Sequence, residues 1–478
     1  MTTKVFGASC VMVISMIVWP AVGQCELDKL LGTDTSILDR FGVSVSISGP
    51  TGKEVVIIGA DGDIDNGYYS AGSAYIFRRS GTSWIQEVKF LASDGSAQDY
   101  FGQSVSICGI SGNEVALVGA PGDGHFSGSA YIYRRSGGAW IEEAKLLAYD
   151  GAIYHYFGQS VSMIGCPENA VAIVGANGNN NHNGYHAGAA YIFRFNQQTS
   201  EWIQEARLIA SDGAAHDNFG FDVKIIGAFG QEVVIVGARG SYANVFYPGA
   251  AYIFRRDADT SEWIEEAKLL ASDGAGFDSF GSKVSIIGTS GHEVAIVSSP
   301  QGDDSGIASG SAYIFRNQGE ASGWIEEAKL VSSDGTNGDV FGFSVAISGG
   351  SGNEIAVVGA FSDSDIRSSS GSVYLYRFNG VDWIEQVEFY ASDAAYFRTS
   401  HFGNSISVNG TPGNEIAIIG AYRQGTSAGS AYIFGLGSAV CCPGDLNGDG
   451  FVDVFDLFRV IHAFFTRGDV AEDLDGDG

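Results

Sequence analysis

A Phe-Gly pair recurs seven times in this chain of 478 residues, at nearly constant spacing. The phenylalanines of the pairs are Phe41, Phe101, Phe157, Phe219, Phe280, Phe341 and Phe402. The intervals between them are 60, 56, 62, 61, 61 and 61 residues. Such a period indicates one supersecondary unit copied seven times, so a repeat architecture is the first expectation. Because the copies resemble each other closely, the sequence shows no single catalytic centre, which makes an enzyme a less favoured expectation.

Each copy contains four short runs of apolar, β-branched or aromatic residues, separated by turn residues. In the second copy these runs are 101–107, 114–120, 128–133 and 140–147. Four antiparallel strands in about 60 residues make one propeller blade, and seven blades are within the usual range. The 68 glycines fit many short strands joined by tight turns. We therefore predict an all-β, seven-bladed propeller over residues 24–436.

The two chain ends are expected to share the last blade. The strand that begins with Trp occurs only six times, at Trp84, Trp140, Trp202, Trp263, Trp324 and Trp383. After the seventh third strand, 431–434, no fourth strand follows, whereas residues 26–31 match the fourth-strand run 142–147. The beginning of the propeller is therefore predicted to supply the missing strand. Closure of this kind removes the exposed sheet edges of an open repeat array.

The first 23 residues have the pattern of a secretory signal, with Lys4, an apolar run over 11–18 and small residues at 21–23. The apolar run is shorter than the ~20 residues that a spanning helix needs, so we expect secretion and no membrane insertion. Cys25 would then begin the outer strand of the last blade, close to the exit of its third strand and to Cys441 and Cys442. We predict a disulfide between Cys25 and Cys441 or Cys442.

The chain carries 55 acidic and 26 basic residues, a net charge of −29. Such a charge should repel nucleic acid and anionic membranes. We expect the protein to bind cations or partners with basic surfaces.

The repeated strands resemble the FG-GAP repeats that also build the heads of integrin α-subunits, and the resemblance covers residues 26 to about 434. Integrin-type repeats carry a calcium loop, Asp-x-Asp/Asn-x-Asp-Gly, after the Phe-Gly strand. Here the corresponding turns, such as 49–53, 109–113 and 349–353, offer no cage of carboxylates. Calcium is therefore not expected in the propeller turns.

The loops between second and third strands should lie on the same face as the links to the next blade. These loops differ strongly among copies, as in 61–69, 177–186, 241–247 and 361–365. The links add polar residues two positions before a phenylalanine, at Asp99, His155, Asp217, Asp278 and Asp339. We expect this face to carry aromatic and acidic side chains together and to bind a protein or glycan ligand.

Some residues on this side have a simpler interpretation. Asp94 and Asp273 are predicted to form turns through bonds to nearby backbone amides. Asp61, Asp63 and Asp65 alternate like calcium ligands, but Asn66 replaces the required glycine, so a solvated loop is predicted there. The repeated phenylalanines and the six tryptophans are predicted to pack between blades.

A sharper motif follows the repeats, after a linker at 437–443. Oxygen side chains occur at positions 1, 3, 5, 9 and 12 of a calcium loop, with Gly450 at position 6 and the backbone carbonyl of Phe451 as a further ligand. The side-chain ligands are Asp445, Asn447, Asp449, Asp453 and Asp456. A second loop begins with Asp473, Asp475 and Asp477 and reaches only its sixth position. A helix is expected after the first loop, because apolar residues from 454 to 465 recur at helical spacing.

This segment, 444–478, resembles part of a type I dockerin, an α-helical module that docks onto cohesin domains in bacterial extracellular assemblies. The resemblance implies Ca²⁺ as the cofactor and a cohesin-like or other extracellular protein as the partner. Val454 and Phe455 stand where dockerins carry a hydroxyl pair that sets the choice of cohesin, which leaves the partner open.

No catalytic residues are predicted. His292-Glu293 lacks the second histidine of a zinc-protease motif. We therefore expect a secreted, non-catalytic binding or adhesion propeller with a calcium-dependent attachment module. The alternatives are an extracellular polysaccharide-active enzyme and a purely structural surface spacer.

Overall fold

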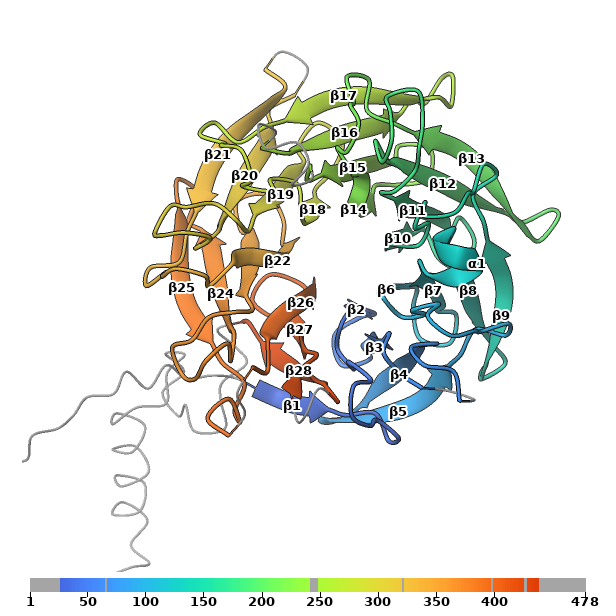
Figure 1. The fold of residues 1–478 in the computed structure, drawn as a ribbon, viewed down its shortest axis with the longest axis horizontal. Coiled ribbons are helices and arrows are strands. Elements are labelled where there is room, and N and C mark those ends of the chain that lie inside the picture. The colour runs from blue at the N-terminus through green and yellow to red at the C-terminus, as the bar shows by residue number, and fades with distance from the viewer. Residues whose placement is uncertain are drawn as a thin grey trace, which may run out of the picture. The chain divides into compact units, whose positions relative to one another are not determined.

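The computed structural model describes residues 26–64, 67–240, 248–319, 322–396, 399–424 and 428–437. Within these residues the chain forms seven four-stranded antiparallel sheets, arranged as blades around a ring (Figure 1). The only helix that lies wholly within the described residues is α1 (Asp123–Phe126), a single turn. The predicted all-β, seven-bladed propeller is confirmed.

Blades are numbered in chain order, and the first strand of each lies innermost. Blades 1 to 3 consist of β2 (Val45–Ser48), β3 (Val55–Ala60), β4 (Ser73–Ser80) and β5 (Ser83–Phe90); β6 (Ser104–Cys108), β7 (Val115–Ala120), β8 (Ser129–Ser136) and β9 (Ala139–Leu146); and β10 (Ser160–Ile164), β11 (Val171–Ala176), β12 (Ala189–Asn196) and β13 (Glu201–Leu208). Blades 4 to 6 consist of β14 (Phe219–Ile226), β15 (Val233–Ala238), β16 (Ala250–Arg256) and β17 (Trp263–Leu269); β18 (Val284–Ile287), β19 (Val294–Ser299), β20 (Ser311–Asn317) and β21 (Trp324–Leu330); and β22 (Phe341–Ser348), β23 (Ile355–Ala360), β24 (Ser372–Phe378) and β25 (Trp383–Phe389). Blade 7 consists of β26 (Phe402–Asn409), β27 (Ile416–Ala421), β28 (Ser430–Gly435) and β1 (Glu26–Leu30).

Blade 7 is built from both ends of the propeller, as predicted. β1 pairs antiparallel with β28, with Lys29 opposite Tyr432. Figure 1 shows the blue β1 beside the red β28. At the junction with blade 1, the Phe41 N–H donates to the Ala428 carbonyl at 2.9 Å. The Phe101 N–H makes the same bond to Ala71 at 3.0 Å, so the closing junction repeats the internal ones.

The repeated aromatic residues pack between blades, which confirms their predicted role. Every Phe-Gly phenylalanine is fully buried, and its ring meets the third-strand tyrosine edge to face at 5.2 to 5.5 Å between centroids. Trp140 of blade 2 packs against Phe90 of blade 1 at 5.4 Å. Each of the seven core clusters joins side chains of two adjacent blades. Burial of these clusters holds neighbouring blades together.

The backbone conformation and close surroundings of the Phe-Gly pairs require glycine at the second position. Gly102 has φ of 93°, in the left-handed region, and an added Cβ would lie 2.2 Å from the Ser73 carbonyl oxygen of the preceding blade. A side chain there is excluded on both grounds.

The described residues contain one disulfide, between Cys108 and Cys166, with Cα atoms 5.7 Å apart. It joins the ends of the first strands of blades 2 and 3 and was not predicted from the sequence. A signal for this pairing was visible in the sequence, since the two cysteines lie at or just after the end of the first strand in successive blades. Cys25, Cys441 and Cys442 lie outside the described residues, as do the signal segment 1–23 and the dockerin-like segment 444–478, so those predictions stay predictions.

Candidate functional site on the loop face

The loops between second and third strands and the interblade links form one face of the ring, which we call the loop face. Backbone hydrogen bonds join the two kinds of segment directly. The Tyr100 N–H donates to the Ser70 carbonyl at 3.1 Å, and the His216 N–H donates to the Tyr185 carbonyl at 2.9 Å. The expectation that loops and links share one face is therefore confirmed.

A group of aromatic side chains lies on this face where blades 1, 2 and 3 meet. Phe126 of α1 is stacked with Tyr154 at 5.8 Å between ring centroids. Tyr156 and Tyr100 lie 5.7 and 6.4 Å from the same ring. Tyr154 is 52% exposed, so the group presents ring surface to solvent.

A second group lies at the next junction, between blades 3 and 4. Tyr185 is stacked on His186 at 4.0 Å, and His216 lies 5.5 Å from the tyrosine ring. Tyr185 is 56% exposed. Asn180 connects the two groups: its N–H donates to His155, which lies between Tyr154 and Tyr156, at 3.4 Å, and its side-chain oxygen accepts the His186 N–H at 2.8 Å. We call the two groups together the aromatic patch: Tyr100, Phe126, Tyr154, Tyr156, Tyr185, His186 and His216.

The ring presents different side chains from one repeated backbone conformation. The residue before each Phe-Gly pair has a positive φ, as in Arg40 (62°), Tyr100 (54°), Tyr156 (56°) and Asn218 (56°). Left-handed backbone is uncommon outside glycine and needs support from the surrounding structure. Here the link hydrogen bonds supply that support, so the scaffold is constant while the displayed side chain changes. Aromatic residues one and three positions before a phenylalanine were visible in the sequence, and they mark this patch.

The acidic residues of the links do not form a ligand surface. Asp99, Asp217 and Asp339 are buried, and their carboxylates accept backbone N–H groups three residues earlier. Burial raises the pKa of Asp99 to about 6. Asp278 makes the same contact, and His155 accepts the Ala152 N–H at 3.2 Å. The expectation of acids displayed beside aromatics is wrong for these positions, because the carboxylates fold back to satisfy the turn.

The prediction of a solvated loop at Asp61 and Asp63 is also wrong. Asp61 is fully buried and pairs with Arg40 at 3.0 Å. Asp63 accepts the hydroxyl of Tyr75 at 3.1 Å and pairs with Lys89 at 2.8 Å. Buried carboxylates need such partners. Asp65 lies outside the described residues.

Asp94 and Asp273 belong to a network that recurs around the ring, and this corrects their prediction as simple turn formers. Asp94 accepts the Tyr131 hydroxyl at 2.7 Å and pairs with Lys145 at 2.6 Å. Asp273 has the same two kinds of partner at the same distances, Tyr313 and Lys329. Partial burial opposes the effect, but the Lys145 and Tyr131 bonds lower the pKa of Asp94. A third-strand tyrosine, a link aspartate and a fourth-strand cation thus join each blade to the next.

Blade 6 breaks this network. The cation opposite the third-strand tyrosine is present in the other blades, as Lys29, Lys89, Lys145, Arg207, Lys268 and Lys329. In blade 6 the residue opposite Tyr374 is Glu388. Tyr374 still donates to Asp334 and Asp363, both at 2.9 Å.

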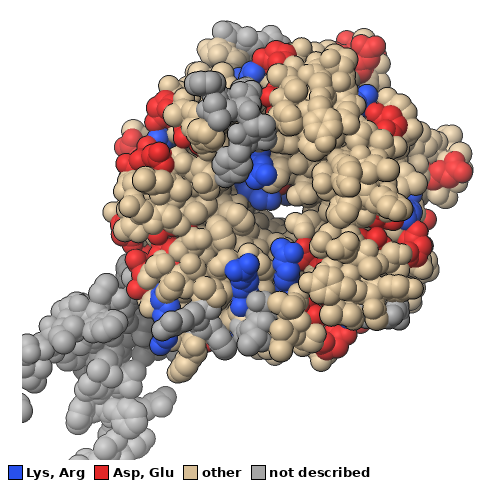
Figure 2. Space-filling view, viewed as in Figure 1, with Lys and Arg blue, Asp and Glu red and all other residues tan. Residues whose placement is uncertain are grey.

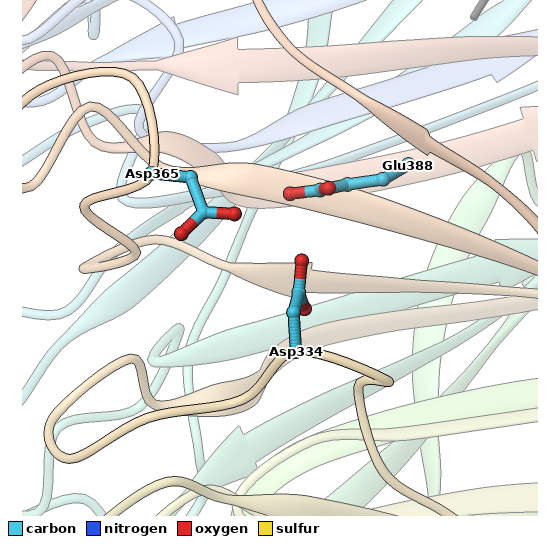
Figure 3. A group of neighbouring side chains, drawn as sticks. All are labelled: Asp334, Asp365 and Glu388. Carbon is cyan, nitrogen blue, oxygen red and sulfur yellow. The ribbon is translucent and has the colours of Figure 1, made fainter. Parts of the chain in front are cut away.

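The result is an acidic cluster of Asp334, Asp365 and Glu388, which point toward one another in Figure 3. One carboxylate oxygen of each lies within 4.8 Å of the others. Burial, followed by the neighbouring carboxylates, raises the pKa of Glu388 to about 7 and that of Asp365 to about 6. Carboxylates crowded in this way retain protons near neutral pH, and their oxygens are also of the type that hard cations prefer.

The calcium ligands predicted in the C-terminal segment all lie outside the described residues. They are Asp445, Asn447, Asp449, Phe451, Asp453, Asp456, Asp473, Asp475 and Asp477. The calcium module therefore stays a prediction. In the described part of the chain, no helix is long and apolar enough to cross a bilayer.

Comparison with known proteins bears on the repeats. No curated protein matches the chain. The family model for the FG-GAP repeat matches seven times, at residues 26–77, 84–133, 140–193, 202–254, 263–315, 324–376 and 383–434. These matches cover most of the chain. Each runs from the fourth strand of one blade through the third strand of the next, and the first match begins with β1, the fourth strand of blade 7. The chain belongs to the FG-GAP repeat family.

Proposed function

We propose that this protein is a secreted, non-catalytic binding propeller that recognises a glycan through the aromatic patch. The exposed rings of Tyr154 and Tyr185 carry the proposal. Aromatic rings stack against the C–H faces of sugar rings, and tyrosine adds a hydroxyl that bonds to sugar hydroxyls. Exposed aromatic side chains gathered on one surface of a soluble domain commonly mark a binding site. A protein ligand at the same patch is the other form of this proposal.

A glycan array probed with the full chain tests the proposal. Tyr154→Ala and Tyr185→Ala should each weaken binding at least tenfold, because each removes a stacking surface without touching the buried core. Tyr396→Ala is the matched control, since Tyr396 is 82% exposed in a link outside the patch. Retention of full binding by both patch variants, or equal loss in the control, would sink the glycan site. A protein pulled down by wild type and lost by the same variants would support the protein form.

A polysaccharide-active enzyme is the second candidate, and the acidic cluster of blade 6 favours it. Carboxyl groups with raised pKa can donate a proton near neutral pH, as glycoside hydrolysis requires. A hydrolysis screen over the same glycans, with Glu388→Gln as the comparison, separates the two. Turnover that disappears in that variant would replace the binding function with an enzymatic one.

We do not propose a serine hydrolase, although the sequence contains one Gly-x-Ser-x-Gly run. The run Gly-x-Ser-x-Gly at 425–429 is followed directly by strand β28, whereas a nucleophile elbow leads from a strand into a helix.

The C-terminal segment is proposed to attach the protein to an extracellular assembly in a calcium-dependent way, through a cohesin-like or other partner. Titration of Ca²⁺ into the full chain should give at least one saturable site. Asp449→Ala should weaken it, because Asp449 is the fifth-position ligand of the loop. Unchanged calcium binding in that variant would remove the dockerin-like assignment while leaving the propeller proposal intact.

A further inference from the structure

The residues of the innermost strands follow a sevenfold pattern that blade 4 breaks. These strands surround a central channel with a cavity of about 650 Å³. Five residues after each Phe-Gly phenylalanine, five blades carry serine and blade 6 carries Ala346, whereas blade 4 carries Lys224. The serines are Ser46, Ser106, Ser162, Ser285 and Ser407. All seven residues occupy the same register against the second strand of their blade.

Serine at this position links adjacent blades. The Ser46 hydroxyl accepts the Ile107 N–H of the next blade at 3.2 Å. The Ser162 hydroxyl accepts the Ile225 N–H, beside Lys224, at 3.3 Å. An ammonium group has no acceptor, so Lys224 cannot make this bond to blade 5. The lysine therefore gives up a structural hydrogen bond and puts a charge in the channel.

Opposing charge in the channel is scarce. Among the described residues that line it, Arg40, Lys224, Arg239 and Lys283 are basic and Asp222 alone is acidic. Asp222 already pairs with Lys283 at 3.4 Å and accepts the Val284 N–H at 2.9 Å.

The Lys224 ammonium group has no hydrogen bond or ion pair with any residue that the structure describes, although Lys224 is half-buried and lines the channel. Burial lowers the pKa of its ammonium group, and nearby Asp222 opposes that effect. Figure 2 shows a group of basic side chains around the central opening, whereas the acidic side chains in this view lie mostly toward the outer edge, with other basic ones among them. In a chain of net charge −29, this centre is a local reversal of sign.

We propose that the channel is an anion site in which the Lys224 ammonium holds a small oxyanion: a carboxylate, sulfate or phosphate group. A charged amine in a confined space without a partner is costly, and an anion offsets that cost. Arg40, from a link, and Arg239, directly after β15, lie at the loop-face end of the channel. Because Asp61 balances the charge of Arg40, Arg239 is the residue that gives an entering anion a favourable potential. Narrow, low-dielectric walls strengthen such a field. The cavity has the size of a small-ligand site. This inference uses none of the residues of the aromatic patch and does not depend on glycan binding.

Isothermal titration of sulfate, phosphate and acetate into the full chain, in chloride buffer of constant ionic strength, tests the proposal. At least one should bind saturably. Lys224→Met keeps an unbranched side chain that is one atom shorter, removes the charge and should weaken binding at least tenfold, whereas Lys224→Arg should retain binding. Lys53→Met is the matched control, because Lys53 is an exposed lysine in the turn between β2 and β3.

Lys224→Ser is a second variant that tests the same charge if Lys224→Met fails to fold, since five other blades carry serine at this position. It should fold as well as wild type and lose the anion. A glucuronate oligosaccharide, compared with free acetate, tells whether the group arrives on a glycan or as a free ion. Absence of saturable binding for every probe, or equal affinity in Lys224→Ser, would overturn the proposal. If the wild-type chain bound an anion but no glycan on the array, the result would count against the proposed glycan site and leave the anion site standing.

Discussion

Replacement of Glu388 by lysine should stabilise the propeller, because it restores the cation that six other blades carry. In the wild type, burial and nearby carboxylates raise the pKa of Glu388 to about 7 from an ordinary value of 4.5. The folded state therefore holds a proton between these two pH values that the unfolded chain has released. Consequently the free energy of unfolding falls as pH rises from 4.5 to 7, and the whole penalty is present above pH 7.

The size of the effect follows from the same shift. The rise of the Glu388 pKa from 4.5 to about 7 would correspond to roughly 3.4 kcal/mol, and partial exposure of Glu388 to solvent reduces this to about 1–2 kcal/mol. A lysine at 388 adds contacts with Asp334 and Asp363 like those of Lys89 with Asp34 and Asp63, both at 2.8 Å. We expect a total gain of about 2–3 kcal/mol at pH 7.5, which is a few degrees in melting temperature for a large chain.

Thermal unfolding in EDTA, at pH 4.5 and pH 7.5, measures this gain. Glu388→Lys should melt higher than wild type at pH 7.5, with a smaller difference at pH 4.5. Glu388→Gln should give the part that comes from removing the carboxylate. Lys329→Glu, the reciprocal change in blade 5, should destabilise and create the same pH dependence. If Glu388→Lys were no more stable at pH 7.5, or gained equally at both pH values, the crowding of carboxylates in blade 6 would not be a source of instability.

Three further predictions concern the scaffold. Gly102→Ala should cost at least about 2 kcal/mol, since it combines a positive φ with a Cβ 2.2 Å from the Ser73 oxygen; a melting temperature within 1 °C of wild type (roughly 0.5 kcal/mol or less) would contradict this. Tyr131→Phe should cost about 1–2 kcal/mol in urea unfolding and return the pKa of Asp94 toward its usual value, as followed by carboxyl NMR; an unchanged Asp94 titration would refute the network. Cys108→Ser should lower stability by about 2–4 kcal/mol, because its disulfide closes a separation of 58 residues; a non-reducing peptide map of wild type that finds a free Cys108 thiol would remove the basis for this value.

The architecture was readable from the sequence because its determinants are local and repeated. The Phe-Gly period, the turns and the fourth-strand match of residues 26–31 each describe short segments, and the same contacts recur in every blade. β1 in blade 7 follows directly from that count. Copies of one unit that bury the same aromatic residues leave little choice of arrangement.

The candidate site was less readable, because it depends on which side chains meet across blades. Asp61 looks like a loop carboxylate in the sequence, yet its partner is Arg40, from the link before its own blade. Cys108 and Cys166 are 58 residues apart and meet only because adjacent inner strands run side by side. The replacement of lysine by Glu388 is visible when the seven copies are aligned. Its consequence is not, since Asp334 and Asp365 come from a link and a loop of variable sequence.

The two breaks in the sevenfold pattern bear on how such a ring acquires a function. Seven equivalent blades offer either seven equal sites or one site on the axis, so a single, oriented site requires at least one copy to differ. Blade 4 places a cation, Lys224, in the wall of the central channel, and blade 6 removes one from the outer network through Glu388. Each change gives up an interaction that most other blades keep: serine stands at the Lys224 position in five blades, and a basic residue stands at the Glu388 position in six. Residues that weaken the scaffold without a structural gain are the ones expected to act on something outside it, and both lie where the loop face or the channel can admit a ligand.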